Sequence, residues 1–351
     1  MIRLARKKCS PIGLDLGAHS LKLLQLSGDR SRLVEAVRWD LPEEASSDDP
    51  EVRGPAVTEA LKQAIGSRDF RGSEVVLSLS ARELYVQNIR VPKMPDGDLS
   101  GVVQQEAAGR VPHDIAETDV RFIEAADIRH GGQMRREVIL FACHRPVLDR
   151  TLDMVTEAGL QPVSVDVEPL ALMRCHAAQF RREEDRTGRA MFVHVGATKT
   201  VVIIAAGADI LFIKYLEVGG MHFDEAVARH LGMDLAAASL LRRHNGDRRA
   251  DQQDADVAKG VSQSIRPVID RLANELLLCI RYHSVTFRGA PLARTIVGGI
   301  EASDYLIEQL TGRHDIPCQV AQPLRGIKSD IEIGREVQWD VAAGLALREI
   351  H

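Results

Sequence analysis

The sequence lacks the features that identify several common classes of protein. Its 351 residues contain no uninterrupted apolar stretch near the roughly 18 residues that a membrane span needs. The best candidate, residues 201–213, is broken by Asp209. The five cysteines form no C-x-x-C pair, so neither a disulfide framework nor a zinc site is indicated. These absences predict a globular protein of a reducing cytoplasm.

Charge and motif content exclude further classes. The net charge of -5 argues against a nucleic-acid partner, because neutralising phosphates requires a cationic surface. No G-x-S-x-G elbow, Walker loop or Rossmann fingerprint occurs, so the catalysis that these motifs serve is not indicated. The length suits two domains, each with a sizeable core.

A strand, turn and strand pattern occurs twice, far apart in the chain. Apolar residues 12–16 and 21–26 flank the first turn, which consists of Gly17, Ala18, His19 and Ser20. Residues 191–195 and 200–204 flank the second turn, which consists of Gly196, Ala197, Thr198 and Lys199. A repeat near the start and just past the middle predicts two duplicated lobes that face one another.

The segments between and after the repeats alternate in character. Residues 43–55 read as an acidic surface loop. Helical spacing of apolar residues predicts helices over 57–65, 99–109, 146–158, 168–179, 221–231, 236–244, 261–286 and 302–310. Strands are expected over 75–79, 84–91, 137–143, 210–216 and 295–297. Residues 84–158 therefore form an inserted subdomain, and the small residues of a closing helix over 341–348 suit packing against a sheet.

The first turn has the chemistry of a phosphate site. Glycine at a hairpin tip lets backbone N–H groups approach phosphate oxygens. Asp15, on the strand before the tip, is a candidate to hold a hydrated Mg²⁺, and Lys22 offers a positive charge to phosphates. An ordinary hairpin turn explains the same residues when they are taken alone.

The second turn has a similar composition. Gly196 and the hydroxyls of Thr198 and Thr200 could face the same phosphates from the opposite lobe. Downstream, a strand runs into Gly298 and Gly299, where small residues would let an adenine and ribose lie against the backbone. The alternative is that these glycines belong to an ordinary loop.

Taken in order, these motifs resemble the nucleotide signatures of actin-like ATPases. The matching segments are residues 12–22, 194–200, Val218 to Gly220 with the following helix, 296–299 and 339–346. Residues 88–95, 106–112 and 159–171 resemble the inserted subdomain shared by the pilus-assembly protein PilM and the cell-division protein FtsA. The chain therefore resembles the PilM family over nearly its whole length.

The resemblance implies an α/β, actin-like fold of the duplicated ribonuclease H type, with two lobes and an inserted α+β subdomain. Residues 1–80 and 166–190 would form the first lobe, and 81–165 the partner-binding insertion. Residues 191–235 and 290–351 would form the second lobe, and 236–289 its helical subdomain.

The resemblance also implies a function. The protein would be a cytoplasmic scaffold of a type IV pilus or related secretion machine that holds the cytoplasmic tail of a PilN-like inner-membrane protein, and would meet the membrane only through that partner. Other inner-membrane components of the machine and self-association stay open. The implied cofactors are ATP and Mg²⁺. The nucleotide residues implied, beyond those of the two turns, are Gly219, Gly220, Arg242 and Ile300.

Several positions depart from the family pattern. His194 replaces an acidic residue and cannot act as a hard oxygen ligand for Mg²⁺. Ser239 and Arg242 stand where relatives often carry Glu and Lys, and Ile300 and Glu301 replace small residues. We therefore expect a weak ATPase at most.

Two other functions are compatible with this superfamily. A sugar kinase would need a carboxylate base near the cleft, and no Asp or Glu after the second turn obviously supplies it. An FtsA-like membrane-associated filament would need an amphipathic tail, and none precedes His351.

Overall fold

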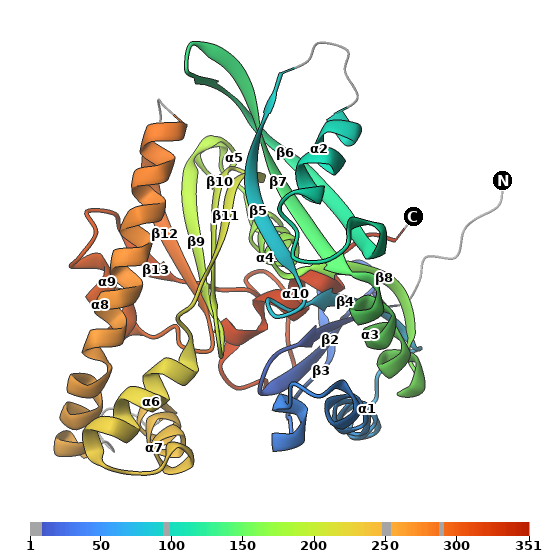
Figure 1. Ribbon diagram of the computed structural model, residues 1–351. Coiled ribbons are helices and arrows are strands. Elements are labelled where there is room, and N and C mark those ends of the chain that lie inside the picture. The colour runs from blue at the N-terminus through green and yellow to red at the C-terminus, as the bar shows by residue number, and fades with distance from the viewer. Residues whose placement is uncertain (1–8, 94–98, 248–253, 288–290, 351) are drawn as a thin grey trace. The chain divides into compact units, whose positions relative to one another are not determined.

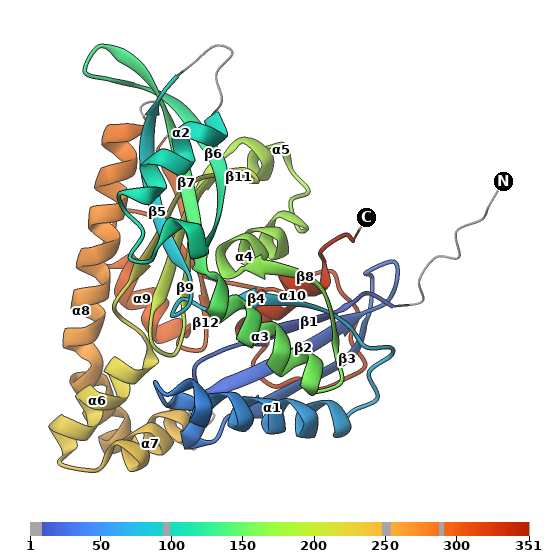
Figure 2. The same cartoon turned by 45° about the vertical axis from the view of Figure 1, so that its right-hand side comes forward.

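The computed structural model describes residues 9–93, 99–247, 254–287 and 291–350, with the backbone alone for 245–247. Residues 1–8 of the predicted first lobe, the end of the segment 88–95 and part of the predicted helical subdomain lie outside this description. The described residues form three sheets and the helices that cover them (Figures 1 and 2).

The first sheet has the strand order β3-β2-β1-β4-β8. Its strands are β1 (Ile12–Leu16), β2 (Ser20–Leu26), β3 (Leu33–Asp40), β4 (Glu74–Leu79) and β8 (Gln161–Val167). The first three strands are antiparallel, whereas β4 runs parallel to both β1 and β8. The predicted hairpin over residues 12–26 is confirmed.

The two faces of this sheet are covered by different helices. Successive side chains of a strand point to opposite faces. Ile12, Leu14 and Leu16 pack in one core with α1 (Pro50–Gly66) and α3 (Arg145–Glu157). Leu24 and Leu26 pack in a second core with α10 (Asp340–Ala346) and with Cys175 of α4 (Glu168–Ala177). The sheet is therefore buried on both sides.

The insertion after β4 forms its own antiparallel sheet, ordered β5-β7-β6. Its elements are β5 (Tyr85–Pro92), α2 (Leu99–Ala108), β6 (Thr118–His130) and β7 (Gln133–His144). Val103 and Ala107 of α2 pack on Val138 and Leu140 of β7 in a separate core. The Asn88 side chain also bonds to both the N–H and the C=O of Ile213, which joins this sheet to β11 (Asp209–Leu216).

The second five-stranded sheet repeats the first. Its order is β11-β10-β9-β12-β13, so the third, second, first, fourth and fifth strands follow one another as they do in the first sheet. The strands are β9 (Arg189–Val195), β10 (Thr200–Ala206), β11 (Asp209–Leu216), β12 (Leu292–Gly299) and β13 (Cys318–Val320). β12 is parallel to both β9 and β13. The predicted duplication is therefore confirmed.

Further helices lie between and after these strands. They are α5 (Glu183–Thr187), α6 (Gly220–Leu231), α7 (Leu235–Asp247), α8 (Ala255–Thr286) and α9 (Asp304–Thr311). Short 3-10 turns occur at η1 (Glu43–Ser46), η2 (Ile115–Glu117) and η4 (Glu336–Trp339). Val227 of α6, Ala238 of α7 and Val261 of α8 form a small shared core.

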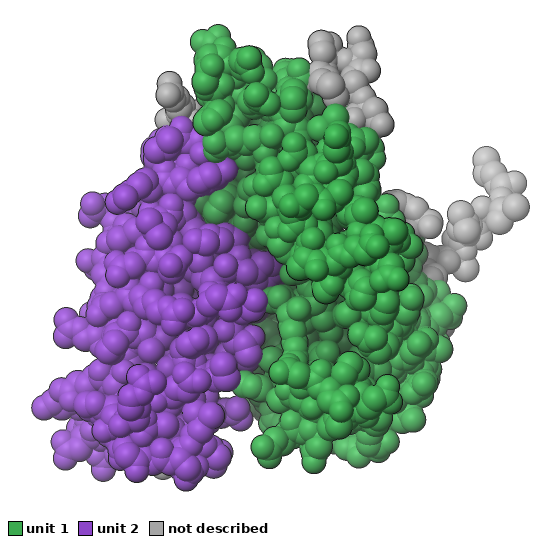
Figure 3. Space-filling model, in the orientation of Figure 1, with its two compact units in different colours: residues 1–188, 203–213, 322–351 green, residues 189–202, 214–321 purple. Residues whose placement is uncertain are grey.

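The chain divides into two compact units, coloured separately in Figure 3. One comprises residues 1–188, 203–213 and 322–351, and the other comprises residues 189–202 and 214–321. Residues 322–351, which the sequence places with the second lobe, thus lie in the first unit. The physical reason is the close packing of α10, in which Arg174 of α4 donates to the carbonyl of Gly344 at 2.8 Å.

Several elements differ from the sequence-based expectation. The prediction of a surface loop over residues 43–55 is wrong from Pro50 onward, because α1 begins there. Asp49 caps that helix by accepting from the N–H of Glu51 at 3.0 Å, and Pro50 suits its first turn. The strands β3, β6 and β8 were not predicted, because their mixed polar and apolar residues give a weak strand signal.

The packing of α10 predicts a large effect for Gly344→Ala. The added Cβ would lie 1.9 Å from the carbonyl oxygen of Ala171, a backbone atom that cannot move aside. We expect the free energy of unfolding, measured in urea, to fall by about 3 kcal/mol. Gly66→Ala, in an open position at the end of α1, is the control and should change it by less than about 1 kcal/mol. Equal effects for both variants would contradict the packing argument.

A buried histidine predicts a pH dependence. His283 is 1% exposed, and burial, helped by the charge of Arg189, lowers its pKa from 6.5 to about 4. Its Nε2 lies 3.3 Å from Nη1 of Arg189, an arrangement that requires the neutral imidazole. The unfolded chain therefore takes up a proton below pH 6.5, whereas the folded chain does so only near pH 4. The stability that this group contributes is complete above pH 6.5 and is lost as the pH falls to 4.

We expect His283→Gln to remove that loss, which amounts to roughly 2 to 3 kcal/mol between pH 6.5 and 4. Urea denaturation at several pH values measures it as the difference between variant and wild type. His230→Gln, at an exposed position of α6, should leave the profile unchanged. Parallel profiles for wild type and His283→Gln would refute the assignment.

Candidate functional site

The first predicted phosphate turn connects β1 and β2 and is closed by glycine. The N–H of Gly17 donates to the carbonyl of Ser20 at 3.1 Å. A Cβ at Gly17 would lie 2.7 Å from that same oxygen, so a larger residue would open the turn. Ala18 and His19 form its tip, and the carbonyl of His19 accepts from Leu41 at 3.0 Å.

Asp15 and Lys22 lie beside this turn and bind each other. They face one another across β1 and β2, and Nζ of Lys22 is 2.8 Å from Oδ2 of Asp15. Their side chains are only 13% and 10% exposed. One carboxylate and one ammonium thus stand at the foot of a turn, as a hydrated Mg²⁺ and a phosphate would require. A bound ion would have to compete with this ion pair.

The second predicted phosphate turn connects β9 and β10 with the same bond. The N–H of Gly196 donates to the carbonyl of Lys199 at 3.0 Å, and a Cβ at Gly196 would lie 2.9 Å from that oxygen. Nζ of Lys199 lies 2.8 Å from a carboxylate oxygen of Glu217. The hydroxyl of Thr200 is buried and donates to the carbonyl of Val218 at 2.6 Å, so it serves the protein backbone.

The predicted Gly219 and Gly220 pack directly against this second turn. Gly220 donates its N–H to the carbonyl of Gly196 at 2.9 Å, and Met221 donates to Ala197 at 2.8 Å. The start of α6 is thereby fixed to the turn. Gly219 must be small because a Cβ there would lie 2.5 Å from the backbone of Thr198, whatever ligand is bound.

Arg242 of α7 is held by two carboxylates. Its Nε donates to Asp224 at 2.6 Å, and its Nη1 and Nη2 donate to the two oxygens of Glu301 at 2.8 and 2.7 Å. Burial alone would lower the pKa of Arg242, but Glu301 and Asp224 outweigh it and raise the pKa above its ordinary value. The guanidinium also lies 5.4 Å from the centre of the Phe223 ring. Arg242 is therefore fully charged and firmly placed.

The remaining predicted nucleoside residues lie at the end of β12. Gly298 and Gly299 pair with His194 and Val195 of β9, and Ile300 follows. Within this unit, the structure thus brings together the second turn, the start of α6, Arg242 and the end of β12. Glu301, noted in the sequence only as a departure, proves to be the partner of Arg242.

The residues suit the two halves of a nucleotide unequally. Each turn offers a glycine hairpin with a lysine nearby, which suits a polyphosphate. At the nucleoside end, the space beside Gly220 is taken by the Glu301 carboxylate, whose Oε1 lies 2.6 Å from where a Cβ on Gly220 would stand. His194 supplies no oxygen ligand, so Asp15 is the carboxylate available to a magnesium ion among the residues predicted for this role.

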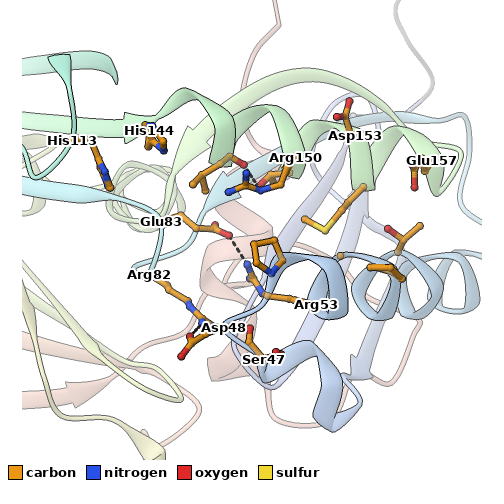
Figure 4. A pocket seen from close by; sticks show the side chains of 17 residues that line it. Ser47, Asp48, Arg53, Arg82, Glu83, His113, His144, Arg150, Asp153 and Glu157 are labelled. Atoms are coloured by element: carbon orange, nitrogen blue, oxygen red, sulfur yellow. Dashed lines mark hydrogen bonds and ion pairs between the residues drawn. The ribbon is translucent and has the colours of Figure 1, made fainter. Parts of the chain in front are cut away.

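A separate cavity of about 450 Å³ opens in the first unit (Figure 4). It lies between α1, α3 and the links before β5 and β6. Its apolar lining consists of Pro50, Pro55, Val147 and Met154. Its polar lining consists of Ser47, Asp48, Arg53, Thr58, Arg82, Glu83, His113, His144, Arg150, Thr151, Asp153 and Glu157. Gly54 of α1 completes the wall.

Ion pairs shape one side of this cavity. Arg53 of α1 binds Glu83 at 2.9 Å, and Glu83 also accepts from the hydroxyl of Ser80 at 3.1 Å. Arg82 pairs with Asp48. Figure 4 shows His113 and His144 at one end and Glu157 at the other. The two imidazole rings stack with centroids 4.5 Å apart.

One lining residue has an unsatisfied polar atom. The hydroxyl of Thr58 is buried and has no hydrogen-bond partner among the described residues. Leaving such a group unpaired costs about 1 to 3 kcal/mol. The cavity itself combines apolar walls with fixed charges, a mixture suited to a peptide or another amphipathic ligand.

No local sequence pattern predicted this cavity. The sequence-based prediction assigned residues 43–55 to a loop, so α1 was too short to form a wall. The Asp49 and Pro50 pair, a helix N-cap followed by proline, was the signal that would have extended the helix. The convergence of α1 with α3, about ninety residues later, has no local signal.

Two further observations concern metal binding and membrane-spanning helices. Among the described residues, no group of three or more His, Cys, Asp or Glu side chains could hold a metal ion. None of the helices in the described part of the chain has the length and apolar content to span a bilayer.

Comparison with known proteins relates this architecture to a family. A family model described as type IV pilus assembly protein PilM matches residues 13–350. The fold is similar to a solved PilM-PilN type IV pilus biogenesis complex, with a TM-score of 0.81 and 24% identity over 98% of each chain. It is also similar to the ethanolamine utilization protein EutJ from Carboxydothermus hydrogenoformans, with a TM-score of 0.58 and 14% identity over 99% of this chain and 92% of that one. Together with the repeated strand order, these findings confirm the predicted actin-like fold.

Proposed function

We propose, from the premise that this chain belongs to the family of the type IV pilus assembly protein PilM, that it is a cytoplasmic scaffold of a pilus or related secretion machine. In this role it binds the cytoplasmic tail of a PilN-like inner-membrane protein. The family match over residues 13–350 is the observation that carries the proposal. The similar solved complex contains PilM together with PilN, which supports this choice of partner.

The cavity beside the inserted subdomain is the proposed tail site. Its apolar walls suit the aliphatic side chains of an extended peptide. Asp153 and Glu157 lie one turn apart on α3 at one end of the cavity. Two carboxylates there favour a tail with a basic residue at that end.

Gly54→Leu tests the cavity directly. A side chain at Gly54 points toward Met154, whose sulfur would lie 3.9 Å from the new Cβ, an ordinary contact. Leucine therefore fills the cavity, and it also favours the helix. We expect the affinity for a synthetic PilN-like tail peptide, measured by isothermal titration calorimetry, to fall at least about tenfold, or 1.4 kcal/mol.

Gly66→Leu is the matched control, because this glycine ends the same helix in open space. It should bind the peptide as the wild type does. Wild-type affinity in a folded Gly54→Leu variant would move the tail site elsewhere. Absence of binding by the wild type to every candidate tail would count against the function itself.

We further propose that the protein binds ATP with Mg²⁺ and that its glycine turns are phosphate-binding elements. Support comes from the glycine-closed turns in both repeats and from the Asp15 and Lys22 pair beside the first. In this proposal the backbone N–H groups of the turn tips and Lys22 contact phosphate oxygens. Asp15 holds the ion through water. Magnesium, when bound, screens the phosphate charge.

Asp15→Asn should weaken binding of a fluorescent ATP analogue in the presence of Mg²⁺ by about tenfold or more, equivalent to at least 1.4 kcal/mol. It should also abolish the dependence of that affinity on Mg²⁺, because the amide cannot replace the anionic oxygen. Asp40→Asn makes the same charge change at an exposed pair on β3 and serves as control. Unchanged magnesium dependence in Asp15→Asn would discard this role for Asp15.

A further inference from the structure

Arg242 links three elements that are separate in the sequence. It lies on α7, and its partners are Asp224 on α6 and Glu301 in the segment after β12. Nη2 of Arg242 also lies 3.3 Å from the carbonyl of Gly220. All of these residues belong to one compact unit, so their mutual placement is internal to it.

The pair between Arg242 and Glu301 has the geometry of a strong interaction. Nη1 and Nη2 of Arg242 donate to the two carboxylate oxygens of Glu301, at 2.8 and 2.7 Å. The side chains of Arg242, Glu301 and Asp224 are only 13 to 15% exposed. Two-point bonding between largely buried charges fixes orientation as well as distance. The Glu301 carboxylate is thus held in one position.

That position is beside a glycine predicted to make room for a nucleoside. Oε1 of Glu301 lies 2.6 Å from where a Cβ on Gly220 would stand, so the space freed by this glycine is filled by the carboxylate. The residues predicted for nucleoside binding, Gly220 and Arg242, are the ones that the carboxylate contacts. The space that the sequence predicts for a nucleoside is therefore occupied by the side chain of Glu301.

We propose that Glu301, held by Arg242, is an internal plug of the nucleoside subsite. The proposal rests on the nucleotide binding proposed above. A nucleoside triphosphate gains its nucleoside contacts only when the carboxylate leaves Arg242, whereas a bare polyphosphate binds at the second turn, in the same unit, without moving the plug. Wild type consequently discriminates little between ATP and inorganic tripolyphosphate.

The chain offers a matched pair of variants. Glu301→Ala removes the plug and leaves Arg242 with Asp224 as counter-ion, so no buried charge is orphaned. Asp224→Asn removes the same unit of negative charge from Arg242 but leaves the carboxylate beside Gly220. If anion affinity rises only because negative charge is lost, it therefore rises in both variants. If ATP affinity rises because space is opened beside Gly220, it rises in Glu301→Ala alone.

The experiment is calorimetric titration of wild type and both variants with ATP and with inorganic tripolyphosphate, each with Mg²⁺. Glu301→Ala is expected to bind ATP about tenfold more tightly than wild type, a change of 1.4 kcal/mol, with tripolyphosphate affinity unchanged. Asp224→Asn should show no selective gain for ATP. Glu301→Gln, similar in shape to the native side chain, should give a smaller gain and serves if the alanine variant fails to fold.

Two results would overturn the plug. One is ATP affinity in a folded Glu301→Ala variant that is equal to or below that of wild type. The other is an equal gain for tripolyphosphate, which would assign the effect to charge. If tripolyphosphate binds wild type and only the ATP gain is missing, the plug alone fails. If no variant binds either ligand, the nucleotide proposal fails and the plug fails with it.

Discussion

A single backbone hydrogen bond, made twice, governs the arrangement of both five-stranded sheets. In each, a glycine N–H at the end of the first strand donates to the carbonyl three residues later. A side chain at Gly17 or Gly196 would collide with that carbonyl. The tight turn holds the first two strands in antiparallel register, and the remaining strands add in the same order in both sheets. The repeat thus extends from one turn to the whole sheet.

Glycine motifs in this chain carry two kinds of information. Gly219 lies where the start of α6 meets the second turn, and Gly344 lies where α10 meets α4. These positions need small residues so that two pieces of backbone can approach. Packing requires small residues at these positions with or without a ligand. The same residues therefore indicate the fold more directly than they indicate nucleotide chemistry.

The departures from the family pattern are coupled in space. Arg242 and Glu301 are fifty-nine positions apart, and each looks like an isolated loss of a nucleotide-binding residue. In the folded chain they bind one another, and Asp224 completes the charge balance. The positive charge of Arg242 is thus balanced by the negative charge of Glu301. By contrast, Asp15 and Lys22 keep the chemistry expected at the first turn while neutralising each other.

Local pattern determined much of this protein. Alternating apolar residues and glycine turns were sufficient to predict the two hairpins, and helical spacing predicted α4, α6, α8 and α9. The order of motifs was sufficient to predict the actin-like fold and the family. Strands such as β6, with polar residues on both faces, have no such local signal because partners elsewhere in the chain stabilise them.

Tertiary structure alone decided which residues meet. It brought α1 and α3 together around the cavity, and it placed Glu301 against Gly220 and Arg242. It also packed α10 in the first unit, although the chain order suggested the second. Periodicity records which face of an element is apolar, but it does not record which other element covers that face. Contacts between distant residues therefore became visible only in the folded chain.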